Sequence, residues 1–441
     1  PCFLTSVTTA IGFGSFYFSE ILPLRELGKV AVFAIMLAYV GIVATNWFCL
    51  FLFSDILSKS PDNIVRIKLN VFLDNIVLFV ERYHKKILSL SLLILLLFAA
   101  AFNLIYTETN FLDVFFKKSI PTYKSFDFVD KHLGGSRAID LVFRADADFD
   151  FQNIENFRTL KNAEQNLLDE EIINDVMSYI DPVQMVHREF RNDNQKLPIS
   201  DQQLQQEILF LEFSRGSEKE DVLSPYLNFD YSAARFALQT DNLSSFEIES
   251  LQEKVKSKLQ KLGLKNFFLA GDNIYTNRLS EYVIDTQIVT ILITFLFIYL
   301  IFVIDFGHRI ALIGLVPNIM PVIITLGLVS YLRIPFDFAT VLIASISFGI
   351  AVDSSIHFLH IHKYYYKQGA RSRALYTKLL HAVGKPMIYN CILFSLAFAL
   401  FLFADLVVLI KFGFFSMIAS FLSLIANLYI LPSLLLAFHE K

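Results

Sequence analysis

The chain contains 441 residues, of which 55% are hydrophobic and 18% are charged, and its formal net charge is −4. Because about one quarter of the residues in a soluble domain are charged, this composition excludes an ordinary soluble protein and indicates one that lies largely in a membrane. All three cysteines, Cys2, Cys49 and Cys391, lie in apolar runs, so no disulfide framework is implied.

The first part of the chain, 1–53, contains two apolar segments, 1–18 and 27–53. About 20 apolar residues cross a bilayer, so both segments predict transmembrane helices. The chain begins with Pro1 and enters an apolar run without a charged leader, a pattern that is typical neither of a signal peptide nor of a natural start. We therefore expect the sequence to be a fragment.

The next part, 54–85, is predicted to be a cytoplasmic connector. Its apolar residues recur at near-helical spacing, with charged residues such as Arg66 and Asp74 between them. This pattern predicts an amphipathic helix along the inner membrane surface; the alternative is an additional span. The apolar segment 86–105 then predicts a transmembrane helix.

A polar region, 106–283, is long enough to form an independent domain. Residues 106–280 contain 29 Asp and Glu against 20 Lys and Arg, so this region is acidic. Its patterns predict strands at 138–147, 173–182, 232–240 and 266–272, and amphipathic helices at 151–170 and 244–263. Ser244 or Ser245 with Glu247 or Glu249 predicts the start of the second helix, and Gly263 its end. Two β-α-β units predict an extracytoplasmic α+β domain of the ferredoxin-like type, with an unassigned insertion at 183–231.

The last part, 284–438, predicts a five-helix transmembrane bundle. Its spans are expected at 284–304, 309–331, 337–361, 386–404 and 409–438. Lys and Arg gather in 363–385 and in the connector, and the positive-inside rule places both on the cytoplasmic side. The large polar domain then lies on the periplasmic or extracellular side of a cell (inner) membrane.

Residues 1–53 align with 386–438 without a gap. The matched positions are Pro1 with Pro386, Phe13 with Phe398, Phe16 with Phe401, Phe18 with Phe403, Glu20 with Asp405, Gly28 with Gly413, and Leu37 with Leu422. Internal duplication is a known construction of transporters. We therefore interpret 1–53 as the last two transmembrane helices of a first repeat, and 284–438 as the bundle of the second.

One acidic residue, Asp353, lies in the middle of an apolar span. A carboxylate at the centre of a bilayer costs several kcal/mol, so such a residue is a candidate for function. On a helix, Gly349, Asp353 and His357 share one face, and Gly349 would let a neighbouring helix approach closely. A group that exchanges protons near neutral pH suits a proton relay, which we predict for Asp353, His357 and Asn390.

Other polar residues of the spans complete this hypothesis. In the repeat, Asn390 matches Thr5 and Cys391 matches Ser6, so Thr5 and Ser6 are candidate counterparts in the first repeat. The alternative to a relay is a structural aspartate, held by hydrogen bonds to Asn390, Thr5 or Ser6. Near the relay, three residues of another span predict a mobile kink or static helix packing: Pro317, Asn318 and Pro321.

A metal site is a second alternative, because Asp353, His357 and His360 have a helical spacing that suits metal ligands. The sequence contains no HExxH motif, no nearby cysteine and no accompanying glutamate. We therefore predict neither a metal nor a cofactor.

The run "GIAVDSSIHFLHIHKYYY" resembles the fourth-span signature that is repeated in each half of the RND superfamily. The closest branch is the predicted exporters allied to the mycobacterial membrane protein large (MMPL) family. Further segments extend the resemblance over essentially the whole chain: 109–116, 131–143, 269–273 and 314–340. One departure is Ser354, where many relatives carry a second acidic residue or a tyrosine.

This resemblance implies a porter-type outer domain and an exporter driven by the proton motive force, not an enzyme. Asp353 matches the aspartate that RND relatives are understood to use as a proton relay. The implied activity is efflux or lipid transport by proton antiport. The alternatives are a Patched-like, sterol-sensing receptor and a proton-driven accessory of protein translocation. The expected partners are a hydrophobic or lipid-like substrate, membrane lipids, protons and further copies of the chain; the acidic outer domain argues against nucleic acid.

Overall fold

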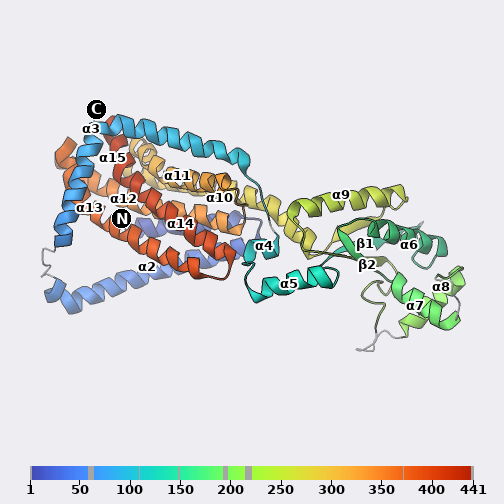
Figure 1. The fold of residues 1–441 in the computed structure, drawn as a ribbon. Helices are drawn as coiled ribbons and strands as arrows, with labels where there is room; N and C mark the ends of the chain where they lie inside the picture. Colours follow the sequence, from blue (N-terminus) through green and yellow to red (C-terminus); the bar gives the residue numbers. More distant parts are fainter. Residues whose placement is uncertain are drawn as a thin grey trace. The chain divides into compact units, whose positions relative to one another are not determined.

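The computed structural model describes residues 2–57, 64–108, 110–147, 149–191, 197–213, 221–370 and 372–438. The chain divides into two compact units. A helical unit contains Pro1–Thr107 and Glu281–Lys441, and an α+β unit contains Glu108–Ser280 (Figure 1).

Seven helices in the described part of the chain are long and apolar enough to cross a membrane. They are α2 (Leu22–Leu57), α3 (Ile64–Ala100), α10 (Asp272–Phe306), α11 (His308–Tyr331), α12 (Phe338–Lys367), α13 (Ser372–Ala399), and α14 (Val407–Ile425) together with the π-helical η4 (Ala426–Ile430) and α15 (Leu431–Phe438). The remaining predicted span, 1–18, forms α1 (Cys2–Gly14) and η1 (Ser15–Phe18), which are apolar but shorter. The prediction of a multi-pass α-helical membrane protein is confirmed.

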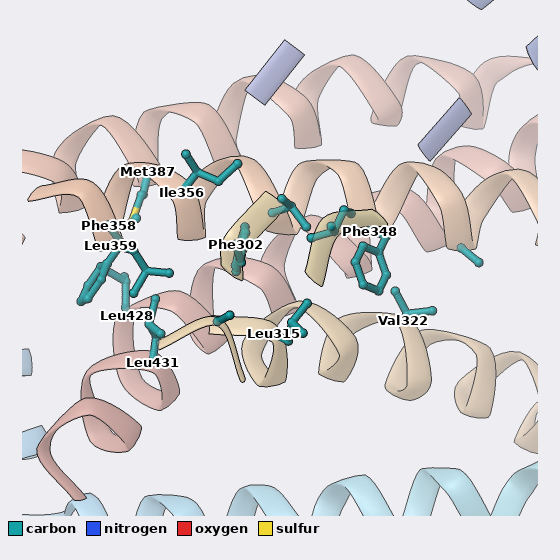
Figure 2. Close-up of a cluster of buried hydrophobic side chains, with 14 of the residues drawn as sticks. Phe302, Leu315, Val322, Phe348, Ile356, Phe358, Leu359, Met387, Leu428 and Leu431 are labelled. Carbon is teal, nitrogen blue, oxygen red and sulfur yellow. The ribbon is translucent and has the colours of Figure 1, made fainter. Parts of the chain in front are cut away.

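Helices α11 and α12 form the centre of the helical unit. In their most apolar stretches 67% and 72% of the residues are buried, against 6% for α2 and α3. Phe302 of α10, Leu315 of α11 and Phe348 of α12 are among the buried side chains of this core (Figure 2). Since α2 and α3 expose apolar side chains, their outer faces are suited to contact with lipid.

The part of the predicted connector from Ile64 onward and most of the span predicted at 86–105 form a single helix, α3, with a bend. Residues 58–63 of the connector lie outside the described residues. The backbone of Tyr83 (φ −123°, ψ 15°) is not helical, and the two parts of α3 run in different directions (Figure 1). Before the bend, Leu73 is buried, and Asp74 Oδ1 lies 2.9 Å from His381 Nε2 of α13. The amphipathic part is thereby attached to the bundle.

The two aligned helix pairs share an irregular backbone. The 3₁₀ turns η1 (Ser15–Phe18) and η3 (Leu400–Phe403) are separated by the same offset, 385 residues (400 − 15), as the sequence alignment. The residue after each turn, Ser19 or Ala404, is extended, and three residues separate each turn from the next helix, which begins at Leu22 in α2 and at Val407 in α14. The sequence match is therefore accompanied by a match of local backbone geometry.

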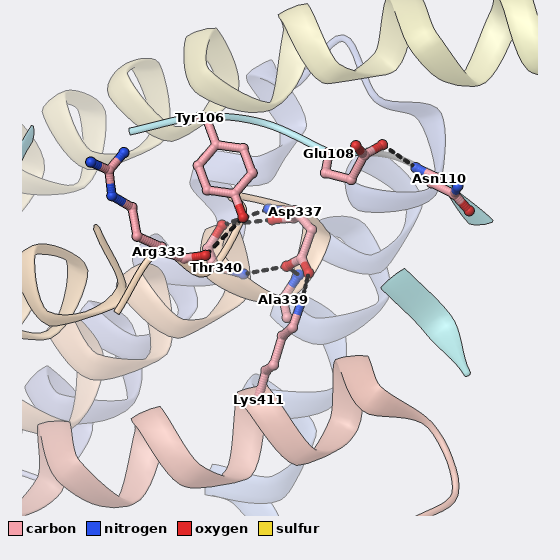
Figure 3. Close-up of polar contacts among 8 residues, drawn as sticks. All are labelled: Tyr106, Glu108, Asn110, Arg333, Asp337, Ala339, Thr340 and Lys411. Carbon is pink, nitrogen blue, oxygen red and sulfur yellow. Dashed lines mark hydrogen bonds and ion pairs between the residues drawn. The ribbon is translucent and has the colours of Figure 1, made fainter. Parts of the chain in front are cut away.

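Helix α12 begins at a buried ion pair. The carboxylate of Asp337 accepts hydrogen bonds from the backbone N–H groups of Ala339 (2.9 Å) and Thr340 (3.2 Å), so it caps the helix. Lys411 of α14 donates to the same carboxylate at 2.8 Å (Figure 3). In the same region, the Tyr106 hydroxyl donates to the carbonyl of Arg333 at 2.7 Å. These contacts fix the starting point of the helix that carries Asp353.

The α+β unit contains a four-stranded antiparallel sheet in the order β2-β3-β1-β4. Its strands are β1 (Arg137–Arg144), β2 (Ile173–Met177), β3 (Ala233–Thr240) and β4 (Phe267–Ala270). Helix α6 (Ile154–Leu168) connects β1 to β2, and α9 (Ser245–Lys261) connects β3 to β4, as in the ferredoxin-like arrangement. Two short helices, α4 (Phe111–Phe115) and α5 (Pro121–His132), precede the sheet.

The ends of α9 agree with the sequence signals. Ser244 and Glu247 form a reciprocal capping box at its start. After its end, Gly263 adopts a positive φ of 81°, and its N–H bonds to the carbonyl of Gln260. Only glycine adopts this conformation readily, which is why this residue type marks the stop.

One predicted strand was too long. The segment 173–182 was expected to be a strand ended by proline, but β2 ends at Met177 and α7 (Ile180–Arg191) begins three residues later. Pro182 lies in the first turn of α7, where its missing N–H leaves no intrahelical bond unmade. The unassigned insertion contains most of α7 together with α8 (Asp201–Glu212), and a buried contact of 2.6 Å between His187 and Glu207 joins these two helices.

Candidate functional site in the membrane helices

Asp353 lies near the middle of α12. It follows the helix cap by 16 residues, which is about 24 Å along the helix axis. Asp353 Oδ1 is 3.7 Å from His357 Nε2, one turn further along. The Thr5 hydroxyl of α1 lies near the same carboxylate and donates to the carbonyl of Cys2 at 2.9 Å. The acid therefore lies between a base on its own helix and a hydroxyl of a different helix.

A cavity of about 570 Å³ opens beside the carboxylate. Asp353, Ser354 and His357 of α12 line one side, and Asn390 of α13 is among the residues that line the other. No hydrogen bond joins Asn390 to Asp353 among the described contacts, so Thr5 is the closer partner. Ser6 donates instead to the carbonyl of Cys2. The cavity nevertheless brings together the three residues predicted as a relay.

Gly349 does not mark a tight helix contact. A Cβ atom at this position would meet the nearest atom, Thr9 Cγ2, at 3.8 Å, which is an ordinary van der Waals distance. The close approach in the core is instead at Gly314 of α11, where a Cβ would lie 2.7 Å from Leu359 Cδ1 of α12. The face of α12 that carries Asp353 is therefore in ordinary van der Waals contact with α1 at this point.

The opposite face of α12 contains a polar centre that the sequence did not indicate. The Ser355 hydroxyl lies 2.8 Å from Asn318 Oδ1 of α11 and 2.7 Å from Asn427 Oδ1 of η4. All three residues are fully buried. Both amide nitrogens donate elsewhere, Asn318 to the carbonyl of Gly314 and Asn427 to that of Ser423. The centre thus joins three helices in the core.

Helix irregularities surround this centre. Pro317 and Pro321 lie inside α11 on either side of Asn318, and each removes one backbone hydrogen bond. Asn427 lies in η4, the π-helical segment, a type of irregularity that is frequent at functional sites. Asn318 was predicted to belong to a kink, whereas Ser355 and Asn427 were missed because small polar residues in spans usually indicate packing.

His360, the next histidine after His357, belongs to a separate cluster. His360 Nε2 lies 2.7 Å from Asp305 Oδ2 of α10, and Lys363 donates to the Asp305 carbonyl at 2.5 Å. His360 is thus paired away from Asp353. In the described part of the chain, no three His, Cys, Asp or Glu side chains are grouped to hold a metal ion.

No protein-family model and no curated protein sequence matches the chain. Among solved structures, it is similar to the hedgehog release protein Disp from the water bear Hypsibius dujardini, with a TM-score of 0.64 and 14% identity. The match covers 99% of this chain and 58% of that one. The chain therefore shares the fold of the matching part of Disp.

The chain is also similar to SecDF, a translocon-associated membrane protein from Thermus thermophilus, with a TM-score of 0.49 and 10% identity. This match covers 100% of the chain and 48% of SecDF. The chain therefore spans about half the length of these solved structures.

Proposed function

We propose that the chain is part of an RND-type exporter of the MMPL-allied branch, driven by the proton motive force. Its substrate is hydrophobic or amphiphilic, and a lipid fits this class best. One observation carries the proposal: a carboxylate, Asp353, lies near the middle of a central membrane helix and opens into a cavity beside His357 and Asn390. An ionisable group at such a position is a functional candidate by default, because the membrane makes its charge costly.

The contacts of Asp353 suggest how a proton acts on the protein. The ionised carboxylate attracts the His357 imidazole, and the Thr5 hydroxyl of α1 lies nearby. When Asp353 takes up a proton, the negative charge that these groups face is lost, and the balance between two arrangements of α1 and α12 changes. A proton gradient therefore biases the position of α1 relative to α12, which is the requirement for alternating access.

Disp is a hedgehog release protein, and release is an activity of the same general kind as export. Two rival functions differ from export in what the protein moves. A sterol-sensing receptor binds lipid without net transport, and a translocation accessory stimulates the movement of a protein substrate. Neither rival predicts that a pH gradient moves a lipid through this protein alone.

The test is transport of a fluorescent phospholipid in proteoliposomes under an imposed pH gradient. Wild-type protein is expected to move the probe only with the gradient, and Asp353→Asn is expected to abolish this movement because the amide cannot exchange a proton. Asp305→Asn is the matched control, since it removes a carboxylate outside the cavity. Full activity of Asp353→Asn would refute the relay. Gradient-independent binding would favour the receptor, and stimulation of protein translocation alone would favour the accessory.

We also propose that the α+β unit lies on the periplasmic or extracellular side of the membrane. The basic loop before α13 supports this orientation through the positive-inside rule. Gln368, in that loop, and Lys261, in the α+β unit, are both exposed, so a cysteine can be introduced at each position. A membrane-impermeant thiol reagent added to intact cells is expected to label the cysteine at position 261 but not the one at position 368. Equal labelling of both would contradict the orientation.

A further inference from the structure

A second cavity lies in the helical unit, with none of the lining residues of the Asp353 cavity. Its volume is about 800 Å³, and it is bounded by α3, α11, α14 and η4. We call it the α3 groove. Tyr83, Lys86, Ile94 and Phe98 line it from α3, Ile324 from α11 and Tyr429 from η4. Its volume lies within the range of about 300–1,000 Å³ that is typical of small-molecule sites.

The three walls of the α3 groove are irregular helices. Helix α3 bends at Tyr83, α11 contains Pro321, and the third wall contains the π-helical η4. Tyr83 and Phe98 are 15 residues apart, which corresponds to about 22 Å along the helix. One leaflet of the hydrocarbon core is about 15 Å thick. The groove is therefore long enough for an extended acyl chain and the start of its headgroup.

The polar groups of the α3 groove gather near the bend. The Lys86 ammonium lies 5.6 Å from the centre of the Tyr83 ring, and Phe79 packs against the rings of both Tyr83 and Tyr429. No acceptor among the described residues bonds to the Lys86 ammonium or to these two phenol hydroxyls. By contrast, the Ser91 hydroxyl donates to the carbonyl of Leu88. Three free donors thus face one end of an otherwise apolar groove.

The charges around the bend are mainly positive. The Arg82 guanidinium lies 5.3 Å from the centre of the Tyr83 ring, and Lys85 precedes Lys86 in the sequence. The acidic residue nearest to the bend in sequence, Glu81, lines a different, smaller cavity. A cation with two phenol donors suits a phosphate group, and basic pockets between membrane helices bind anionic headgroups.

We propose that the α3 groove binds one anionic phospholipid, with an acyl chain along Ile94 and Phe98 and the phosphate at Lys86, Tyr83 and Tyr429. The apolar walls recognise the chain, and the unpaired donors recognise the negative headgroup. A neutral lipid would leave the Lys86 charge without a partner. This site is separate from the Asp353 cavity, so the proposal goes beyond the proposed transport function and does not depend on it.

The headgroup is tested by lipid competition. Purified protein in nanodiscs of phosphatidylcholine and phosphatidylglycerol is analysed by native mass spectrometry for retained lipid. Wild-type protein is expected to retain phosphatidylglycerol in preference to phosphatidylcholine. Lys86→Gln should reduce the preference about fivefold, the effect of about 1 kcal/mol for one basic residue near an anionic surface. Lys85→Gln is the matched control, because it removes the same charge from an exposed neighbour outside the groove.

The acyl chain is tested by filling the groove. Ile94→Trp should lower retention of phosphatidylglycerol, whereas Leu93→Trp, on the exposed face of the same turn, should leave it unchanged. Equal effects of Lys86→Gln and Lys85→Gln would overturn the headgroup site. Unchanged retention in Ile94→Trp would overturn the groove as its location, and equal retention of both lipids by wild-type protein would overturn the anionic occupant.

Discussion

Gly413 lies inside α14, where it packs closely against the end of α13 and the following 3₁₀ turn, η3. A Cβ atom at Gly413 would lie 2.5 Å from the carbonyl oxygen of Phe398 and 2.7 Å from Phe401 Cβ. Both atoms belong to the backbone or are fixed to it, so no side-chain rotation relieves the overlap. Overpacking of this kind costs about 1–3 kcal/mol. Gly413→Ala is therefore expected to destabilise the helical unit, although alanine favours a helix by about 1 kcal/mol over glycine.

Two further glycines provide the controls. Gly28 occupies the aligned position, where a Cβ would lie 2.8 Å from the Phe13 carbonyl oxygen, so Gly28→Ala should also destabilise. Gly41 of α2 has no atom within 4 Å of such a Cβ, and Gly41→Ala should stabilise through helix propensity alone. The assay is the apparent midpoint of thermal unfolding in detergent. A Gly413→Ala variant as stable as Gly41→Ala would refute the close packing.

Three further outcomes are expected. Lys411→Met should cost about 3–5 kcal/mol by leaving buried Asp337 without a counter-charge, and adding Asp337→Asn should recover most of this in thermal unfolding; no recovery would contradict the ion pair. Ser355→Ala should cost about 1–3 kcal/mol in the same assay, because it removes the donor from two buried amide oxygens; an unchanged midpoint would argue against the polar centre. A hydrogen bond from Lys258 holds the pKa of Glu170 below its ordinary value. This stabilisation is present above the ordinary carboxyl pKa and is lost as pH falls through the lowered value, so Lys258→Met should be less stable than wild type at neutral pH and equal to it in acid; a difference that persists in acid would contradict this.

Much of the α+β unit was predictable because its signals are local. The capping box of Ser244 and Glu247 and the positive φ of Gly263 depend on residues within one or two helical turns. The helix after β2 was not predicted, because Pro182 reads equally well as the end of a strand and as the first turn of a helix. Only the packing of α7 on α8, through His187 and Glu207, separates these readings.

In the helical unit, the sequence indicated Asp353 but not the polar centre on the other face of α12. A carboxylate in a span is a rare and costly feature, so a single residue is informative. Ser355 and Asn427 are 72 residues apart in sequence, and each alone resembles a packing residue. They meet because α12 and α14 run parallel to each other, and a hydropathy pattern does not reveal how helices are arranged.

The two faces of α12 suggest which contact changes during function. Residues two positions apart on a helix point about 200° apart, so Asp353 and Ser355 face different neighbours. On the Ser355 face, α12 is joined to α11 and η4 by buried hydrogen bonds, and the Asp337–Lys411 pair joins its start to α14. On the Asp353 face, Gly349 is in ordinary van der Waals contact with Thr9 of α1, and the Thr5 hydroxyl lies near the carboxylate. A proton on Asp353 acts on this face and leaves the buried hydrogen bonds of the other face in place. The geometry therefore favours movement of α1 against a fixed α12, rather than movement of α12 within the core.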